Sequence, residues 1–319
     1  MPSNSLNILV VGAGQIGSRH LQALAAMPSV ATVAAVDPST ASRDIALSRW
    51  KDVVGHDRKL LRFAQSLAEL ENTDFDLAII ATSAPGRLEI LRQVVALGVR
   101  RVLSEKLLFQ SVGELDAAVT LIADHGVRLY PNYVYRFVSP WLQVSQHLTD
   151  KSFAMDVRAG DIGLATNLPH WLDIFQFVSG APVIEVNVTL SKPPYPSKRG
   201  GGLLEIAGTA SARSASGATF EMFCDGPMQA PVATLIGRAG RLIADEGART
   251  LVGDLLGNRV TLEVPMVSRT TALAVSQIME DQTVLPSLDV IAETNRLLLR
   301  ALGSVVLDAY DDDKTVPVT

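Results

Sequence analysis

The segment NILVVGAGQIGSRH, residues 7–20, decides the fold. An apolar, strand-like run leads into the first of three glycines, and a helix-like run begins at the last. In this context the first glycine permits a tight turn, the second lets the backbone approach a pyrophosphate, and the third lets helix and strand pack closely. The amide groups at the start of the helix would face the phosphates. The segment therefore predicts a dinucleotide-binding turn, with cofactor contacts at Gly12, Gly14, Gln15, Ile16 and Gly17.

An acidic residue, Asp37, ends the second predicted strand in the segment VAAVDPS. It lies about 20 residues beyond the glycines, where a carboxylate can hydrogen-bond the ribose hydroxyls of adenosine. The same carboxylate would repel a 2′-phosphate, and no arginine follows it immediately to receive one. The expected cofactor is therefore NAD rather than NADP. The alternative interpretation is that Asp37 only forms a turn ahead of Pro38.

The first third of the chain alternates strand-like and helix-like segments, which is typical of repeated βαβ units on a parallel sheet. All-apolar strands such as ILVV and LAII suit a sheet that is covered on both faces. Strands are expected at residues 7–11, 32–36, 77–81, 101–104 and 127–132, and helices at residues 16–26, 61–70, 88–97 and 112–125.

Beyond residue 128 the pattern changes to longer β segments, the last at residues 260–264, which predict an antiparallel sheet with one open face. Helices are expected at residues 140–148, 170–178 and 288–302, and the Pro- and Gly-rich segment 191–202 is expected to be a mobile loop or lid. The predicted fold class is α/β. Residues 1–128 form a Rossmann domain with a doubly wound parallel sheet, and residues 129–319 form an α+β domain, with a mostly antiparallel open-faced sheet, for substrate binding and oligomerisation.

Composition excludes several classes of function. The 319 residues carry a net charge of -5, so no basic field exists to hold nucleic acid or an anionic membrane. The single cysteine, Cys224, excludes an internal disulfide and a cysteine-based zinc site, and no metal site is expected. The N-terminal segment lacks the basic start of a signal peptide, which favours a cytoplasmic protein.

Four segments together resemble the Gfo/Idh/MocA family of oxidoreductases over nearly the whole chain: VGAGQIGSRHLQAL, FDLAIIATSAPGR, VLSEKLL and HWLDIFQFVSG. In that family a motif lysine hydrogen-bonds the reacting oxygen of the substrate, and a helix histidine exchanges its proton. Lys106 and His170 match those two positions and are the expected catalytic residues. Further contacts are expected with the cofactor at Thr82 and Glu105, and with the substrate at Arg136, Thr166, Asn167 and Asp173.

Chemistry supports the same pair of catalytic residues. Lys106 ends an apolar strand of a parallel sheet, and ligands bind outside the carboxyl ends of such strands. An imidazole that titrates near a pH of ~6.5 suits proton exchange in both directions. The alternatives are a surface lysine and a structural histidine. Asp173 would either orient the ring of His170 or serve as a carboxylate near the helix N-terminus.

The chain departs from the family pattern at two places. The family usually has proline after the lysine, where Leu107 stands here, and Leu107 loses the fixed φ of proline and its easy access to a cis bond. The family also has a carboxylate three or four residues before the histidine, where Thr166 and Asn167 stand, and neither can supply a negative charge. Arg87 replaces a frequent histidine and is expected to contact a cofactor phosphate or a substrate carboxylate.

The resemblance implies an NAD(H)-dependent dehydrogenase or reductase that acts on a CH–OH group of a sugar, cyclitol or sugar acid. The segments NYVYRFVSP and VPVT further resemble members associated with bacterial cell-surface sugars. The alternatives are a hydrolase that oxidises its substrate transiently with bound NAD, and a cofactor-binding protein without turnover. The expected partners are a small sugar-like molecule and further copies of the chain, as a homodimer or homotetramer formed through the open sheet face.

Overall fold

The computed structural model describes residues 5–70, 74–148, 150–238, 240–254, 260–261 and 267–318. The chain forms two compact units, and each is discontinuous in sequence. The first unit contains Met1–Phe109, Asp116–Asn132 and Pro265–Asp289, and the second contains Gln110–Leu115, Tyr133–Val264 and Val290–Thr319. With the expected domains at residues 1–128 and 129–319, the chain would pass from one unit to the other once. In the structure it passes between the two units several times.

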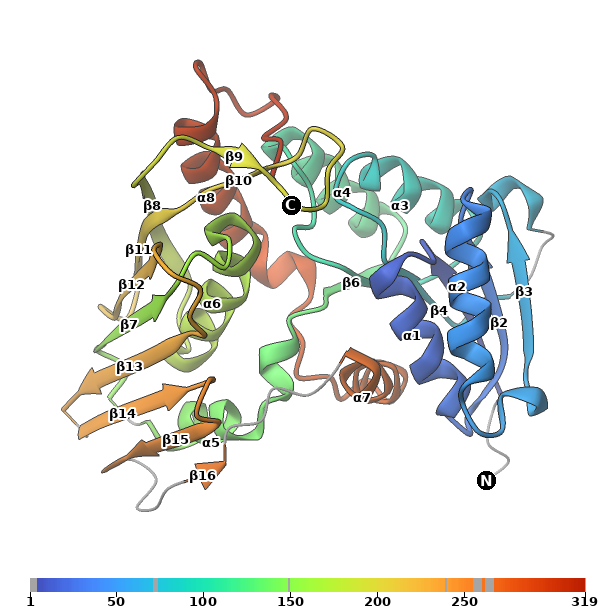
Figure 1. Cartoon of the computed structure of the whole chain (residues 1–319), viewed down its shortest axis with the longest axis horizontal. Helices are drawn as coiled ribbons and strands as arrows, with labels where there is room; N and C mark the ends of the chain where they lie inside the picture. Colours follow the sequence, from blue (N-terminus) through green and yellow to red (C-terminus); the bar gives the residue numbers. More distant parts are fainter. Residues whose placement is uncertain are drawn as a thin grey trace. The chain divides into compact units, whose positions relative to one another are not determined.

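The first unit is built on a six-stranded sheet in the order β3-β2-β1-β4-β5-β6, and every pairing in it is parallel (Figure 1). The strands consist largely of apolar residues and are buried at their centres because helices cover the sheet. The strands are β1 (Leu6–Val11), β2 (Val30–Val36), β3 (Leu60–Ala64), β4 (Leu77–Ile80), β5 (Arg101–Ser104) and β6 (Arg128–Pro131). The helices are α1 (Gln15–Ala26), α2 (Thr40–Lys51), α3 (Arg87–Ala96), α4 (Val112–Asp124) and α7 (Val267–Met279). Two 3₁₀ turns, η1 (His56–Arg58) and η2 (Leu67–Glu69), flank β3. This is the predicted Rossmann architecture.

The connection between β2 and β3 differs from the prediction. The helix expected at residues 61–70 is wrong, because that stretch contains β3, which pairs with β2, and then η2. The connecting helix is α2, which lies earlier and was not predicted. Its only buried residues are Ala46 and Trp50, so its sequence lacks a clear apolar stripe. Its start is fixed by Ser39, whose hydroxyl accepts a hydrogen bond from the amide of Ser42.

The second unit is built on an eight-stranded sheet in the order β16-β15-β14-β13-β7-β12-β11-β8 (Figure 1). Only the β7–β12 pairing is parallel, so the sheet is mostly antiparallel, as predicted. The strands are β7 (Phe153–Ala159), β8 (Val183–Leu190), β11 (Gly208–Ser214), β12 (Thr219–Cys224), β13 (Val232–Gly237), β14 (Gly240–Asp245), β15 (Thr250–Gly253) and β16 (Val260–Thr261). The strand expected at residues 260–264 lies partly outside the described residues.

One face of this sheet is covered and the other is open. Buried and exposed residues alternate along β7, β11 and β12, as expected for a sheet with a single covered face. On the covered face, Phe175 of α6 (Leu164–Ser179) packs against Phe153 and Phe220, with ring centroids 6.0 and 5.5 Å away. The remaining elements are η3 (Val134–Phe137), α5 (Ser139–His147), α8 (Leu288–Val306) and the small β9 (Tyr195–Pro196) and β10 (Leu204–Glu205) pair.

Two sequence predictions in the second unit need adjustment. Helix α6 begins at Leu164 rather than at residue 170, because Pro169 lies inside the helix and does not mark its start. Segment 191–202 contains β9, whose Tyr195 and Pro196 pair with β10. Among the described residues, no helix is long and apolar enough to cross a membrane.

Candidate active site

The turn between β1 and α1 explains why its glycines are needed. Gly12 has a φ of +91°, and a Cβ at Gly17 would lie 1.8 Å from the carbonyl oxygen of Gly12. Side chains are therefore excluded at both positions. A Cβ at Gly14 would instead meet no atom within 4 Å, and no described side chain caps α1 there. The open space at the start of α1 fits a pyrophosphate group.

The first residues of α1 are held by α2. Arg49 donates to the side-chain oxygen of Gln15 at 2.8 Å and to its carbonyl oxygen at 3.1 Å. Gln15 and Ile16 are both exposed. These two predicted cofactor contacts therefore lie on the surface of the turn, where a ligand can reach them.

Asp37, at the end of β2, is joined to the glycine turn. Its Oδ2 accepts the amide hydrogen of Ala13 at 2.7 Å, and its Oδ1 accepts that of Ser39 at 2.8 Å. The residue thus forms a local turn and also fixes the loop between β1 and α1. Sequence reasoning missed Arg43. Its guanidinium donates to the carbonyl oxygen of Asp37 at 2.5 Å and so places a positive charge beside the end of β2.

Thr82 follows β4 and lies behind the glycine turn, since a Cβ at Gly12 would come within 3.0 Å of its amide nitrogen. The hydroxyl oxygen of Thr82 is buried and has no hydrogen-bond partner within the described ranges. A buried hydroxyl without a partner is costly to maintain. A polar cofactor group beside it would remove that cost, and the contact between Thr82 and the cofactor stays a prediction.

Glu105, directly after β5, belongs to a buried polar cluster. Its Oε1 lies 3.2 Å from Nε2 of His20 and accepts from the amide of Asn132 at 2.7 Å. Nδ1 of the same histidine lies 2.7 Å from the hydroxyl of Thr271 on α7. Burial alone would raise the pKa of Glu105, but the hydrogen bonds of His20 and Asn132, with the charges of His20 and Lys106, lower it to about 2. The cluster holds a carboxylate beside the candidate catalytic lysine.

Arg87 does not lie where its expected role requires. It is 1% exposed, and its guanidinium donates to backbone carbonyls. These belong to Glu105 at 2.7 Å, to Leu108 at 3.1 Å, and to Thr82 and Leu107. The expected contact with a cofactor phosphate or substrate carboxylate is wrong, because the long side chain turns inward from the start of α3. Arg87 instead braces the backbone on both sides of Lys106.

Lys106 is half-buried beyond the carboxyl end of β5. The peptide bond between Lys106 and Leu107 is cis. The side chain of Leu107 is buried at 2% exposure. The lysine thus lies on the ligand-binding edge of the parallel sheet, as predicted.

In the second unit, His170 lies on α6 and is 9% exposed. Its ring contacts two tyrosines of the η3 region, with centroids 5.9 Å from Tyr133 and 5.4 Å from Tyr135. Burial raises the pKa of Tyr133, and the negative charge of Asp173 raises it further. Both phenols are therefore neutral neighbours of the imidazole at ordinary pH.

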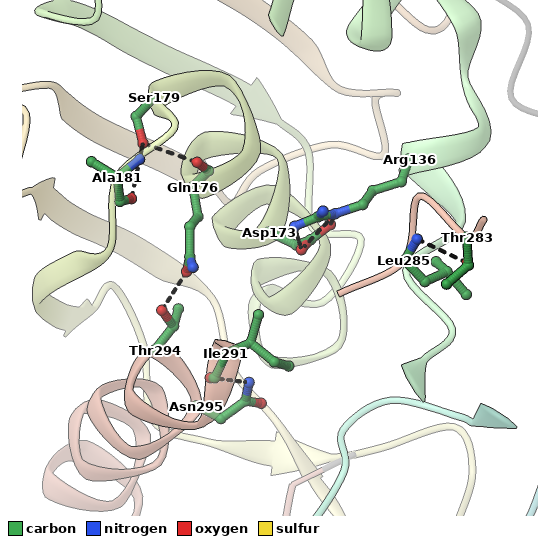
Figure 2. Close-up of polar contacts among 10 residues, drawn as sticks. All are labelled: Arg136, Asp173, Gln176, Ser179, Ala181, Thr283, Leu285, Ile291, Thr294 and Asn295. Atoms are coloured by element: carbon green, nitrogen blue, oxygen red, sulfur yellow. Dashed lines mark hydrogen bonds and ion pairs between the residues drawn. The ribbon is translucent and has the colours of Figure 1, made fainter. Parts of the chain in front are cut away.

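Asp173 is paired with Arg136, and Figure 2 shows the two side chains facing each other. Nε and Nη2 of Arg136 donate to Oδ1 of Asp173 at 3.0 and 2.7 Å, and Nε also donates to Oδ2 at 2.8 Å. Burial raises the pKa of Asp173, and Arg136 offsets part of that rise. Asp173 lies well beyond the first turn of α6, so it is not an N-terminal carboxylate. The structure brings together two predicted substrate contacts, and their role towards substrate stays a prediction.

Thr166 and Asn167 lie in the first turn of α6 and bond to different groups. The hydroxyl of Thr166 donates to Oε2 of Glu205 at 2.5 Å. The amide of Asn167 donates to the carbonyls of Ile162 at 2.9 Å and Gly163 at 2.8 Å. Asn167 therefore shapes the loop before the helix, whereas Thr166 contacts a carboxylate.

Sequence reasoning missed Glu205, which is 7% exposed. Its Oε1 accepts the amide hydrogens of Ala165 at 2.8 Å and Ile206 at 3.0 Å. A Cβ at Gly163 would lie 2.4 Å from the same carboxylate, so only glycine fits there. The available signal was an acidic residue inside the apolar stretch LLEIAG, since a buried charge needs a specific reason.

Each unit thus gathers its own part of the predicted site. In the first unit the glycine turn, Asp37, Thr82 and the Glu105–Lys106 pair follow β1, β2, β4 and β5, so they share the carboxyl edge of the sheet. In the second unit α6 carries Thr166, Asn167, His170 and Asp173. Helix α8 supports α6 there, since Thr294 donates to Oε1 of Gln176 at 2.5 Å (Figure 2).

Comparison with known proteins agrees with this architecture. Residues 6–133 match the model of a family described as an oxidoreductase family with an NAD-binding Rossmann fold. No curated protein matches the sequence significantly.

Solved structures match over almost the full chain at low identity. An oxidoreductase from Agrobacterium radiobacter in complex with NAD⁺, L-tartaric acid and magnesium is 14% identical, with a TM-score of 0.71 over 97% of this chain and 98% of that one. GenD2 from gentamicin A biosynthesis, in complex with NAD, is 19% identical, with a TM-score of 0.72 over 96% and 95%. UDP-N-acetylglucosamine 3-dehydrogenase GnnA from Acidithiobacillus ferrooxidans is 16% identical, with a TM-score of 0.67 over 94% and 96%. The two-unit fold is shared by all three.

Proposed function

We propose that the chain, whose residues 6–133 match the NAD-binding Rossmann model of the Gfo/Idh/MocA oxidoreductase family, transfers a hydride between NAD and a secondary alcohol or ketone of a sugar, cyclitol or sugar acid. It is a dehydrogenase or reductase. The observation that carries the proposal is the shared sheet edge of the first unit. There the pyrophosphate turn, Asp37 and Lys106 follow strands of one parallel sheet.

The residues present fit the cofactor. The space over Gly14 is open and would admit a pyrophosphate, the carboxylate of Asp37 lies beside the glycine turn and would bond the ribose, and the buried hydroxyl of Thr82 lacks a protein partner among the described residues. When bound, NAD supplies the acceptor of the hydride. NAD is preferred to NADP in this proposal because Asp37 would repel a 2′-phosphate.

The catalytic roles fall to Lys106 and His170. Oxidation of an alcohol removes a hydride from carbon and a proton from the hydroxyl. The ammonium group of Lys106 hydrogen-bonds the substrate oxygen, and the imidazole of His170 takes the hydroxyl proton, or returns it in the reducing direction. Arg136, Thr166, Asn167 and Asp173 belong to the proposed substrate-binding surface.

The test is a screen for NADH formation with sugars, cyclitols and sugar acids. Nucleotide-activated sugars belong in the panel because GnnA acts on UDP-N-acetylglucosamine and because two segments resemble members associated with cell-surface sugars. NADH formed in proportion to a ketone product supports the proposal. Bond hydrolysis with retained NAD and no net NADH would instead support the hydrolase, and NAD binding without any turnover would support the binding protein.

A further inference from the structure

A cavity of about 390 Å³ lies in the second unit beside the start of α6. We call it the α6 cavity. It lies within the size range of ligand sites, roughly 300–1,000 Å³. The residues that matter for its chemistry are Asp161, Thr166, Tyr195, Lys198, Arg199 and Glu205. They come from three parts of the chain: the start of α6 with its preceding loop, segment 191–202, and β10.

The hydroxyl of Thr166 has a defined direction in this cavity. Glu205 is fixed by the amide groups of Ala165 and Ile206, and Thr166 donates its hydroxyl hydrogen to that carboxylate at 2.5 Å. A threonine hydroxyl carries one hydrogen but two lone pairs. Its oxygen therefore faces a ligand as an acceptor, which suits a hydroxyl donor on the ligand.

The second acidic residue of the cavity, Asp161, is ion-paired with a lysine. Oδ2 of Asp161 accepts from Nζ of Lys192 at 2.5 Å, and Oδ1 accepts from the hydroxyl of Tyr195. Although burial would raise the pKa of Asp161, these two hydrogen bonds lower it. The contacts also tie segment 191–202 to the loop before α6. Asp161 therefore contributes to the shape of the cavity and little to its net charge.

Lys198 and Arg199 follow one another in segment 191–202, line the same cavity and are exposed. An exposed cation next to a cavity attracts an anionic group of a ligand, and an arginine matches carboxylate or phosphate oxygens.

We propose that the α6 cavity binds a hydroxylated ligand that also carries an anionic group, with Thr166 accepting from a ligand hydroxyl and Lys198 and Arg199 contacting the anion. This inference rests on the proposed function, because the ligand is the part of the substrate away from the reacting carbon. The shared chemistry is a polyol anion. Its charge can come from a carboxylate, as in a sugar acid, or from a phosphate.

The test is calorimetric titration of the full chain, saturated with NAD, with D-glucose, D-glucuronate and D-glucose 6-phosphate. At least one charged probe is expected to bind about tenfold more tightly than D-glucose. The tighter of the two charged probes identifies the anion. Equal affinities for all three probes, or no binding by any of them, would overturn the proposal.

Variants separate the two halves of the cavity. The double variant Lys198→Gln/Arg199→Gln should weaken the charged probe about tenfold and leave D-glucose unchanged. Thr166→Val should weaken every probe, whereas Thr166→Ser, which keeps the hydroxyl, should not. Arg92→Gln, on the exposed side of α3 in the first unit, is the matched control and should change nothing. Unchanged probe affinity in the double variant contradicts the proposal.

NAD titration in the same samples keeps the two proposals distinguishable. Intact NAD binding, together with turnover of an uncharged sugar and no preference for charged probes, would refute the α6 cavity alone. If the unmodified chain does not bind NAD, the proposed function itself is refuted.

Discussion

Asp37 is the residue on which cofactor choice depends. Asp37→Ala should weaken NAD about tenfold, because hydrogen bonds to a charged group contribute roughly 1.5–3 kcal/mol, and it should narrow the preference over NADP. Arg43, already at the carbonyl of Asp37, would then be available to a 2′-phosphate. Calorimetry with both cofactors measures the ratio. Asp44→Ala, on an exposed position of α2, is the control, and an unchanged ratio in Asp37→Ala would reduce Asp37 to a turn residue.

Turnover depends on His170 and Lys106. General acid–base catalysis contributes typically ~10²–10⁴-fold, so His170→Ala should lower kcat within that range once a substrate is known, with NAD affinity nearly intact. Lys106→Ala should have a comparable effect. Steady-state kinetics and NAD titration together make the measurement. Near-normal turnover in His170→Ala would assign proton transfer to solvent or to Tyr135, which lies 5.4 Å from the ring of His170.

The hydrogen bonds of Arg87 lead to a prediction about the stability of the fold. Its buried guanidinium donates to the carbonyls of Thr82, Glu105, Leu107 and Leu108, and removing it takes one donor from each of them. Arg87→Met should lower the free energy of unfolding by about 3–5 kcal/mol, and Arg87→Lys should lose a large part of the same stability because it lacks the planar fork. Urea denaturation measures the change. Arg92→Lys, at an exposed position of the same helix, should leave the free energy of unfolding unchanged. If Arg87→Lys also leaves it unchanged, the hydrogen bonds to the carbonyls contribute little to stability.

At the residue level the sequence could predict chemistry but not every partner. The glycine turn and Asp37 were predictable because their tasks depend on local spacing. The inward turn of Arg87 and the contact between Thr166 and Glu205 depend on segments 20 and 39 residues away. No local pattern encodes such pairings, so Arg87 was given the wrong partners and Glu205 was not considered.

Four elements meet at Glu105, and their contacts predict how the stability of the fold depends on pH. Its carboxylate, placed after β5, joins His20 of α1 to Asn132 after β6, and His20 reaches Thr271 of α7. The pKa of Glu105 falls from 4.5 to about 2 in the folded chain. Because the folded pKa is the lower one, the stabilisation is complete above a pH of about 4.5 and is lost as the pH falls towards 2.

The size of the effect follows from the shift in pKa. Lowering the pKa of Glu105 from 4.5 to about 2 corresponds to roughly 3 kcal/mol. Unfolding followed between pH 5 and 2 should therefore show a steeper loss of stability in the native chain than in Glu105→Gln. Glu89→Gln, on the exposed side of α3, should keep the native slope. Parallel curves for the native chain and Glu105→Gln would show that the cluster does not hold the carboxylate charged.

Elements were predictable where burial pattern and boundary signals agreed. The strand at Val183–Leu190 alternates from Glu185 onwards, and the strand at Arg101–Ser104 is short and largely buried. Helix α2 was missed because only two of its residues are buried, and β3 was mistaken for a helix because apolar residues recur at helical spacing there. Helix α7 was missed although Ala274, Val275 and Ile278 are buried, and no element was expected between the strand at residues 260–264 and the helix at residues 288–302.

At the level of the whole molecule, the open sheet face is the proposed oligomer surface. Its β13 and β15 strands expose the apolar side chains of Ile236 at 54% and Val252 at 41%. We expect a homodimer or homotetramer in solution. Ile236→Asp should shift it towards monomer in light scattering coupled to size exclusion. Ile45→Asp, an exposed apolar position of α2, should leave the mass unchanged. A monomeric native chain, or an unchanged mass in Ile236→Asp, would contradict this surface.

The packing of α7 on α1 also sets an order of events during synthesis. Helix α1 is among the first elements to leave the ribosome, yet the hydroxyl that bonds its buried His20 lies 251 residues further along the chain. At translation rates of about 5–20 residues per second, that interval lasts roughly 10–50 s. Throughout it the nascent first unit lacks α7, and with it the Thr271 hydroxyl that bonds Nδ1 of His20. The chain is therefore expected to depend on ribosome-associated chaperones during its translation.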